Sequence, residues 1–291
     1  MHARPLLVIA TTLLAPAICA QAQTSLPAPW DSVGRILQTA GTSTAGYYRY
    51  GWPRRDITLR IGDVTVAPGL ALGAWAGFSG DSATATMMGD LVLTGDEVKP
   101  VLAELASQRI DVIAIHNHVV GDPQVTYVHF HADGEPRDLA KRLDRVLART
   151  KTPRPVTAPP AQPLTVDTAL VFSTLGLRGR AQGSIVQMST VLVPGQVTMN
   201  GRVLNPAMAY GTPINIQVLP GGRAVATGDF SIPGEKVAAV LSALTANGIT
   251  ATALHTHLIG EQPAVYYMHF WADGPLNDVL RGLRAGLDAA R

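Results

Sequence analysis

The chain contains two copies of one long unit, and this duplication restricts the folds open to it more than any other feature. Two stretches share the pattern His-x-His, Gly, then His-Phe-x-Ala-Asp-Gly, at residues 111–134 and 250–274. Upstream, Gly89-Asp90 matches Gly228-Asp229, and matching residues stay close to 139 positions apart. A period this long indicates duplication of a whole domain and not a solenoid of short repeats.

The repeat boundaries divide the chain into segments. We expect a first repeat unit at 23–150 and a second at 165–291. The segment between them, 151–164, is rich in proline, and such composition is typical of a stiff, extended linker. Each unit then has the size of an ordinary domain. We expect the two units to pack against each other within the chain.

Hydrophobic patterns within a unit predict an α+β fold, with an antiparallel sheet and helices packed on one face. Apolar runs and alternation predict strands at 57–66, 71–78, 83–93, 110–119 and 125–132, the last two as a hairpin around Gly121-Asp122. Helical spacing predicts helices at 94–107 and 136–147. Thr94 and Glu97 have the spacing of a capping box, whereas Pro100 favours a regular helix that starts only there. The second unit repeats this order.

The first 22 residues have the pattern of a secretory signal peptide. A weakly basic start precedes an apolar core at 6–18, which is too short to span a bilayer, and a small-x-small cleavage site at 20–22. We therefore expect a periplasmic or secreted protein without a transmembrane segment after cleavage. The single cysteine, Cys19, lies inside this peptide, and lipidation is not expected because Ile18 before it is not small. A metal ion in the mature chain would have only nitrogen and oxygen ligands.

Composition and motifs exclude several classes of function. The 291 residues carry a net charge of only +2, and the basic residues are scattered along the chain. This distribution predicts neither nucleic-acid binding nor attraction to an anionic membrane. The sequence also contains no phosphate-binding loop, serine nucleophile elbow or dinucleotide fingerprint. A metal ion or a small molecule is therefore the expected partner.

Every histidine beyond the predicted signal peptide lies in the two repeated stretches. Alternation along a strand places His116 and His118 on one face with Val112 and Ala114. The neighbouring strand would bring Tyr127 and His129 to the same face, with Tyr127 opposite His116. The more apolar opposite face, which we assign to the helices, carries Ile113, Ile115, Val128 and Phe130. Unit two divides in the same way, with Leu254, Leu258, Met268 and Phe270 opposite its histidines.

Two histidines at i and i+2 plus a third from the next strand can offer three nitrogens to one metal ion. Such a set with an open fourth position is the arrangement of catalytic zinc. The candidate ligands therefore form one set per unit. The first set is His116, His118 and His129, and the second is His255, His257 and His269. Zinc is the expected ion, with copper or nickel as alternatives that also suit imidazole ligands.

Several neighbouring side chains are candidates for a pocket or for outer contacts to the ligands: Arg55, Asp56, Tyr127, His131, Asp133, Tyr267, Trp271 and Asp273. His131 is replaced by Trp271 in the second unit, so we rank it below the other histidines. The Asp-Gly pairs at 133–134 and 273–274 are expected as turn residues. Asp90 and Asp229 are expected either as partners of the histidines or as β-bulge residues.

The repeated motifs resemble those of the LppY/LpqO-like family of bacterial secreted proteins. The resemblance covers nearly the whole mature chain, and its most specific parts lie at 114–118, 129–130, 255–257 and 269–274. Segments 53–56 and 71–78 also look like the family's upstream motifs. The second unit departs from the pattern at Arg55-Asp56, where it has Val191 and Leu192 or nearby residues. The resemblance implies a duplicated domain of unknown function and brings no reaction.

Three functions therefore stay open. The first is an extracytoplasmic protein that binds a divalent metal ion in each unit. The second is a metal-assisted hydrolase or lyase acting on a small envelope molecule, in which the same histidines activate water. The third is a structural or interaction module with buried, hydrogen-bonded histidines. If only one unit is active, we expect it to be the first, which has more polar groups.

Overall fold

The computed structural model describes residues 26–158, 160 and 162–291, and the predicted signal peptide with Cys19 lies outside these residues. Each repeat unit forms a six-stranded antiparallel sheet covered by helices on one face. This confirms the predicted α+β class. Among the described residues, no helix is both long and apolar enough to cross a membrane.

The first unit has the strand order β1-β2-β5-β6-β8-β7. Its strands are β1 (Gly41–Thr44), β2 (Tyr47–Pro53), β5 (Gly73–Gly80), β6 (Ala85–Thr94), β7 (Asp111–His116) and β8 (Val125–Gly134), with a separate hairpin of β3 (Arg60–Ile61) and β4 (Val64–Thr65). Its helices are α1 (Trp30–Leu37), α2 (Pro68–Ala71), α3 (Gly95–Ser107) and α4 (Pro136–Leu147).

The second unit repeats this topology with the order β9-β10-β13-β14-β16-β15. Its strands are β9 (Gly179–Gln182), β10 (Ile185–Thr190), β13 (Thr212–Val218), β14 (Arg223–Ile232), β15 (Thr250–His255) and β16 (Tyr266–Pro275), with a separate hairpin of β11 (Thr198–Met199) and β12 (Arg202–Val203). Its helices are α5 (Thr168–Leu175), α6 (Pro206–Ala209), α7 (Val237–Ala246) and α8 (Leu276–Ala289), with short 3-10 turns η1 (Pro220–Gly222) and η2 (Gly234–Lys236).

Local signals account for the helix positions. Helix α3 has the predicted capping box: the Thr94 side chain and the Glu97 carboxylate cap each other's backbone N–H groups. This cap starts the helix at Gly95, so Pro100 lies inside the helix, and the expectation that the regular helix begins at Pro100 is wrong. Helix α4 has the predicted bounds, with Pro136 at its first position, where the missing N–H costs no hydrogen bond.

Three strand expectations are corrected by the sheet geometry. The segment 57–66 contributes only the short β3–β4 hairpin, which lies outside the six-stranded sheet. Asp133-Gly134 and Asp273-Gly274 are not turns, because they lie in β8 and β16. A β-bulge at Ile113 shifts the register of β7, which turns Val112 towards the helix side with its partner Phe130. Ile113 instead joins the apolar contact between the two units.

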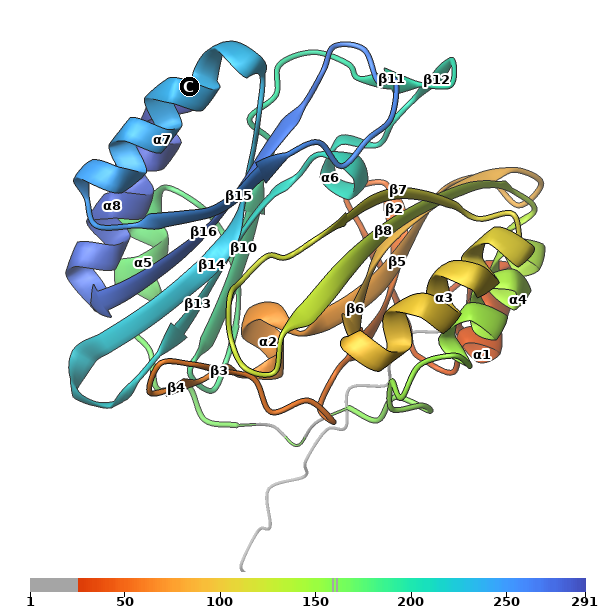
Figure 1. Ribbon diagram of the computed structural model, residues 1–291, viewed down its shortest axis with the longest axis horizontal. Coiled ribbons are helices and arrows are strands. Elements are labelled where there is room, and N and C mark those ends of the chain that lie inside the picture. Colours follow the sequence, from red (N-terminus) through yellow and green to blue (C-terminus); the bar gives the residue numbers. More distant parts are fainter. Residues whose placement is uncertain (1–25, 159, 161) are drawn as a thin grey trace, which may run out of the picture.

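The two sheets face each other, and the longer helices lie on the outside, namely α1, α3 and α4 in the first unit and α5, α7 and α8 in the second (Figure 1). The order of layers is therefore helices, sheet, sheet, helices, with the short helices α2 and α6 at the contact between the units. The facing surfaces share a buried apolar cluster drawn from both units, which includes Met88, Ile113, Met208, Tyr210 and Leu258. Leu258 is buried in this interface, whereas the sequence pattern predicted that it would lie beneath the helices of its own unit.

Reciprocal polar contacts join the units along this interface. The short helix α2 of the first unit contacts β10, β13 and β14 of the second. Asn215 Nδ2 donates to Leu70 O at 3.0 Å, and Gln217 Nε2 donates to Thr65 O at 3.0 Å. In the opposite direction, Asn205 Nδ2 donates to Ala45 O at 2.9 Å. The units therefore hold their inner faces, which carry the histidines, in a defined mutual orientation.

Candidate metal centre

The candidate ligands of both units lie in a single group between the sheets, which we call the histidine cluster: His116, His118, His129, His255, His257 and His269. The closest rings belong to different units. The ring centroids lie 3.8 Å apart for His116 and His255, and 4.0 Å apart for His118 and His269. The His129 and His257 rings are 3.9 Å apart. The cluster is therefore a shared feature of the interface, in place of a separate site in each unit.

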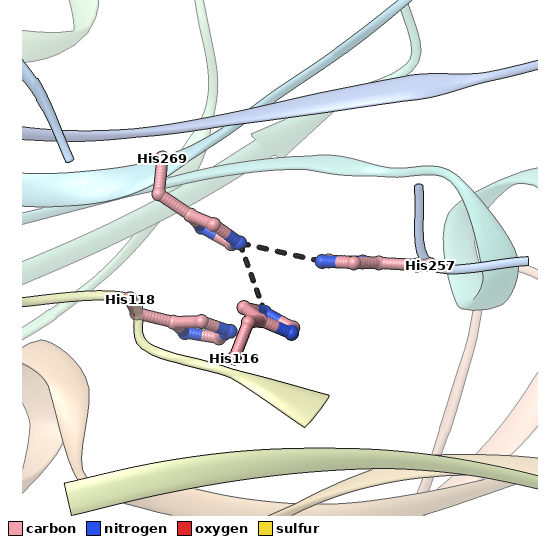
Figure 2. A group of neighbouring side chains, drawn as sticks. All are labelled: His116, His118, His257 and His269. Carbon is pink, nitrogen blue, oxygen red and sulfur yellow. Dashed lines mark hydrogen bonds between the residues drawn. The ribbon is translucent and has the colours of Figure 1, made fainter. Parts of the chain in front are cut away.

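Four of these histidines, drawn in Figure 2, each place one ring nitrogen within 4.8 Å of the others: His116, His118, His257 and His269. His269 Nε2 lies 3.1 Å from His116 Nε2 and 3.3 Å from His257 Nε2. A tetrahedral zinc ion with bonds of about 2.0–2.1 Å requires ligand nitrogens about 3.3–3.4 Å apart. The two separations from His269 Nε2 are therefore close to those of ligands that share an ion.

The histidines come from three kinds of position: His116 and His255 end the edge strands β7 and β15, His118 and His257 lie in the loops that follow, and His129 and His269 lie on the neighbouring strands β8 and β16. Strand β7 ends at His116, so His118 lies in the loop and not on the strand as predicted. This loop pairs with the β3–β4 hairpin through two 2.9 Å hydrogen bonds between the backbones of Arg60 and Asp122. Gly121 permits the approach, because a Cβ there would lie 2.6 Å from Arg60 O. The hairpin thus positions the loop histidine.

The second unit holds its loop in the same way. Strand β15 ends at His255, and Thr198 of the β11–β12 hairpin exchanges two 2.9 Å backbone hydrogen bonds with Gln262. One contact also ties the loops across the interface: Thr252, at the bulge of β15, donates its hydroxyl to His118 O at 2.6 Å. The positions of His118 and His257 therefore depend on backbone contacts far from them in sequence.

A tyrosine supports each loop histidine. The His118 ring stacks on the Tyr127 ring with centroids 3.6 Å apart, and the His257 ring stacks on the Tyr267 ring with centroids 3.8 Å apart. The Tyr127 hydroxyl donates to Ala71 O at 2.8 Å, and the Tyr267 hydroxyl donates to Ala209 O at 2.9 Å. Burial raises the pKa of both phenols well above 10. They therefore remain neutral and position the imidazole rings rather than transfer protons.

Asp229 lies directly beside the central histidine. Its Oδ1 lies 2.5 Å from Nδ1 of His269, whose side chain is fully buried. A carboxylate at this position favours the tautomer with the proton on Nδ1, which leaves the Nε2 lone pair towards His116 and His257. Carboxylate partners of this kind are common behind metal-binding histidines. The expectation of Asp229 as a histidine partner is met.

Five of the six histidines have a buried ring nitrogen that makes no hydrogen bond. Among the described residues, eight buried side-chain N or O atoms make none, and six of them belong to the cluster and to Asp90: Asp90 Oδ1, His116 Nδ1, His118 Nε2, His129 Nε2, His255 Nε2 and His269 Nδ1, of which only the last has a charged neighbour within 3 Å, Asp229 at 2.5 Å. Buried polar groups are normally paired, because an unpaired one costs about 1–3 kcal/mol. The concentration of these atoms in one place makes the cluster a group that could hold a metal ion.

Burial disfavours the charged form of five of the histidines. It lowers the pKa of His118, His129 and His257 well below 6.5, and the neighbouring imidazoles lower it further. The pKa values of His116 and His255 are also lowered, mainly by burial. Neutral imidazole is the form that coordinates metal ions. These five histidines therefore offer lone pairs over a wide range of pH.

A second group of donor atoms borders the first. Asp90, His118 and His129 each offer one atom within 4.8 Å of the others. Asp90 Oδ2 lies 3.8 Å from His118 Nε2, and Asp90 Oδ1 lies 3.8 Å from His129 Nε2. Burial, together with the charge of Asp229, raises the pKa of Asp90 well above 3.8. Asp90 thus differs from its counterpart Asp229, which contacts Nδ1 of a histidine.

Arg55 and Asp56 serve contacts other than the histidines. Arg55 is exposed and donates to Thr157 O at 3.1 Å. Asp56 instead pairs with the preceding arginine, Arg54, at 2.8 Å. Arg54 is fully buried and also pairs with Glu97 at the start of α3 at 2.8 Å. The sequence pattern drew attention to the exposed arginine, while the buried neighbour carries the structural role.

We expect Glu97→Gln to destabilise the protein by about 3 kcal/mol, because it leaves a buried guanidinium without one of its two charged partners. Arg55→Ala is the matched control and should change the free energy of unfolding by less than about 0.5 kcal/mol, since its side chain is exposed. Urea denaturation followed by circular dichroism measures both. Equal effects of the two substitutions would contradict the structural role of the Arg54–Glu97 pair.

The remaining predicted pocket residues lie around the cluster without joining it. His131 is buried between Asp111 and Asp133, at 3.7 and 3.6 Å. Asp133 accepts a 2.6 Å hydrogen bond from the Thr86 hydroxyl. Trp271 packs against the apolar core of the first unit. Asp273 pairs at 2.7 Å with Arg223, which also reaches Asp63 of the first unit at 2.6 Å. Arg223, held by Asp273, thus joins the two units together with Trp271.

A family described as Domain of Unknown Function (DUF1259) matches residues 31–149 and again residues 169–289. Two solved structures are similar at 11% identity: a trimeric bacterial microcompartment shell protein, PduB, with a TM-score of 0.23, covering 87% of this chain and 91% of that chain, and EtuB from Clostridium kluyveri, with a TM-score of 0.22, covering 87% and 90%. TM-scores this low carry no argument about fold or assembly. No curated protein matches the chain. Because the family match covers both units, the chain belongs to the DUF1259 family and contains two copies of its domain.

Proposed function

We propose that this protein binds a divalent metal ion in the histidine cluster, outside the cytoplasm. The observation that carries the proposal is the convergence of Nε2 atoms from both repeats, with His269 Nε2 3.1 Å from His116 Nε2 and 3.3 Å from His257 Nε2. Zinc is the first choice, and copper and nickel also suit an all-imidazole set. Within its family we place the chain with the LppY/LpqO-like proteins, because of the motif around His255 and His269.

Hydrogen bonding alone accounts poorly for this arrangement. With the proton of His269 held on Nδ1 by Asp229, Nε2 has one lone pair but faces two other Nε2 atoms. One lone pair accepts one well-aligned hydrogen bond. A cation at the common centre interacts with all three nitrogens at once. The metal-binding function is therefore preferred to a purely structural role.

Binding is preferred to catalysis for the four-histidine group. Four nitrogen ligands complete the tetrahedral shell that is typical of structural zinc sites, whereas catalytic zinc keeps one position open. The central ligands are also buried, with His269 fully enclosed and His257 5% exposed. An ion held here links the two sheets, so a role in metal storage, sensing or stabilisation of the paired units fits best.

The test is metal binding by the full mature chain, purified without an affinity tag and stripped with a chelator. Zinc, copper or nickel is then added, and the bound metal and the melting temperature are measured. An ion at 100 times its Kd stabilises the folded state by about 2.7 kcal/mol, which corresponds to a rise of about 5–10 °C for a chain of this size. His131→Gln, outside the four-histidine group, should keep this response. A chain that binds none of the three ions would overturn the proposal.

A further inference from the structure

The donor group of Asp90, His118 and His129 has no role in the four-histidine site, apart from the shared His118. We propose that it binds a second divalent metal ion, so that the interface holds a pair of neighbouring ions. This inference rests on the proposed function, because the second ion lies beside the first. The observations that support it are the geometry of the three donors, their missing partners and the difference between the two repeats.

The geometry fits coordination and not direct hydrogen bonding. The two N···O distances, from Asp90 to His118 and from Asp90 to His129, are both 3.8 Å. Hydrogen bonds between these atoms would require about 2.7–3.2 Å. A metal ion with bonds of about 2.0–2.2 Å to nitrogen and oxygen spans such a separation, because two bonds together exceed it. Each carboxylate oxygen of Asp90 therefore faces a different imidazole across the width of an ion.

The three donor atoms also lack other partners. Asp90 Oδ1, His118 Nε2 and His129 Nε2 are buried and have no hydrogen-bond partner. A buried carboxylate is costly unless it is paired with a cation or protonated. Arg49 lies near enough to favour the charged form, but its guanidinium is stacked on the Trp75 ring at 4.0 Å. A divalent ion would pair with Asp90 and with both imidazoles at once.

The asymmetry between the repeats indicates two different tasks for equivalent aspartates. Asp229 contacts Nδ1 of His269 and directs Nε2 towards the first ion. Asp90 faces Nε2, the metal-binding nitrogen, of both His118 and His129. Asp229 is therefore a positioning residue, whereas Asp90 is a ligand. Two histidines and one carboxylate form a typical ligand set for a metal ion with open positions.

Sharing of His118 has a chemical consequence. The Nε2 atom of His118 faces Asp90, so with two ions present His118 coordinates the second ion. The first ion then keeps the three Nε2 atoms of His116, His257 and His269 and gains a position for water or a small anion. A pair of ions with such positions is the arrangement of two-metal hydrolytic sites. The second ion would thus convert a closed binding site into a reactive one.

The experiment counts zinc ions in the full mature chain by elemental analysis and isothermal titration. We expect about two zinc ions per chain in the wild type and about one in Asp90→Asn, with the melting temperature showing that the variant is folded. His129→Ala is the second variant and should also lose only one ion. Asp111→Asn, an exposed carboxylate change on β7, is the matched control and should keep two. Asp229→Asn should keep two ions but bind the first about 10–100-fold more weakly.

The outcomes separate this inference from the proposed function. No zinc in the wild type overturns both. One zinc in the wild type, with unchanged affinity in Asp90→Asn and His129→Ala, overturns the second site and leaves the first. Two zinc ions in the wild type and in both variants also overturn it, because the second ion would then bind elsewhere. Cobalt(II) absorption spectra, recorded as one and then two equivalents are added, check that the two ions enter different ligand sets.

Discussion

His116→Ala and His257→Ala should each remove the same metal ion, although the two histidines belong to different repeats. Each contributes an Nε2 atom that lies near Nε2 of His269, at 3.1 and 3.3 Å. Loss of an outer-shell partner typically costs 10–100-fold in metal affinity. Loss of a direct ligand should cost more than about 100-fold. Zinc titration of the chelator-treated chain, followed by calorimetry, measures this loss.

The double variant His116→Ala/His257→Ala provides the decisive comparison. If both residues bind one ion, the double variant should lose no more zinc than either single variant, and the two effects on affinity should be strongly non-additive. Independent sites in the two repeats would behave differently: each single variant would lose one ion, and the double variant would lose both. Tyr266→Phe, an exposed change in β16, is the control for general damage to the strand.

Acidification should destabilise the metal-free protein steeply. Burial holds the pKa of His118, His129 and His257 well below 6.5 in the folded state. In the unfolded chain the same residues take up protons near pH 6.5. The unfolded state therefore binds more protons below this pH. The stability that depends on neutral histidines is fully present above about pH 6.5 and is lost as the pH falls below it.

The free energy of unfolding of the metal-free protein should fall steeply with decreasing pH, because several histidines act together. Each contributes up to about 1.4 kcal/mol per pH unit, so that three contribute up to about 4 kcal/mol per pH unit. Asp90 opposes this trend, since its raised pKa favours the folded state as the pH falls, but it is one group against several. Urea denaturation of chelator-treated protein at pH 7.5, 6.5 and 5.5 measures the slope. Equal stability at these pH values would show that the histidines are not buried as neutral groups.

A matched variant tests the source of the pH effect. The double variant His118→Gln/His257→Gln removes two histidines whose pKa is lowered in the folded state but keeps polar side chains of similar size. The change in the free energy of unfolding below pH 6.5 should therefore decrease by up to about 2.7 kcal/mol per pH unit. Zinc should also restore stability at pH 6.5 in the wild type, because the bound ion competes with protons for the same nitrogens. An unchanged slope in the variant would assign the effect to other residues.

Local sequence patterns predicted the elements of this fold well, because helix and strand preferences act over a few residues. The apolar spacing of 136–147 and the capping box at Thr94 and Glu97 correspond to α4 and α3. Pro100 was misleading, because the cap and the packing of α3 outweigh the loss of one hydrogen bond inside the helix. The β-bulge at Ile113 was invisible in the pattern, and it reversed the predicted faces of Val112 and Ile113.

For the site, the repeated His-x-His motifs identified the side chains that converge, since clustered histidines are conspicuous in a sequence whose only histidine outside the two repeated stretches is His2. They did not reveal which histidines meet. The four-histidine group takes two members from each repeat, and Asp90 and Asp229 have different contacts although their local sequences match. Equivalent residues in a duplicated chain look alike in sequence, so the pattern alone suggested two equivalent sites.

The sequence by itself thus determined the duplication, the α+β units and the identity of the candidate ligands, because these follow from composition and short-range periodicity. Only the tertiary structure decided that the two sheets face each other and that the histidines form one cluster between them. The reason is physical: the contacts that set this arrangement, such as Thr252 with His118 and Asn215 with Leu70, join residues more than 130 positions apart. No local pattern specifies such a contact, because it depends on how two complete units pack.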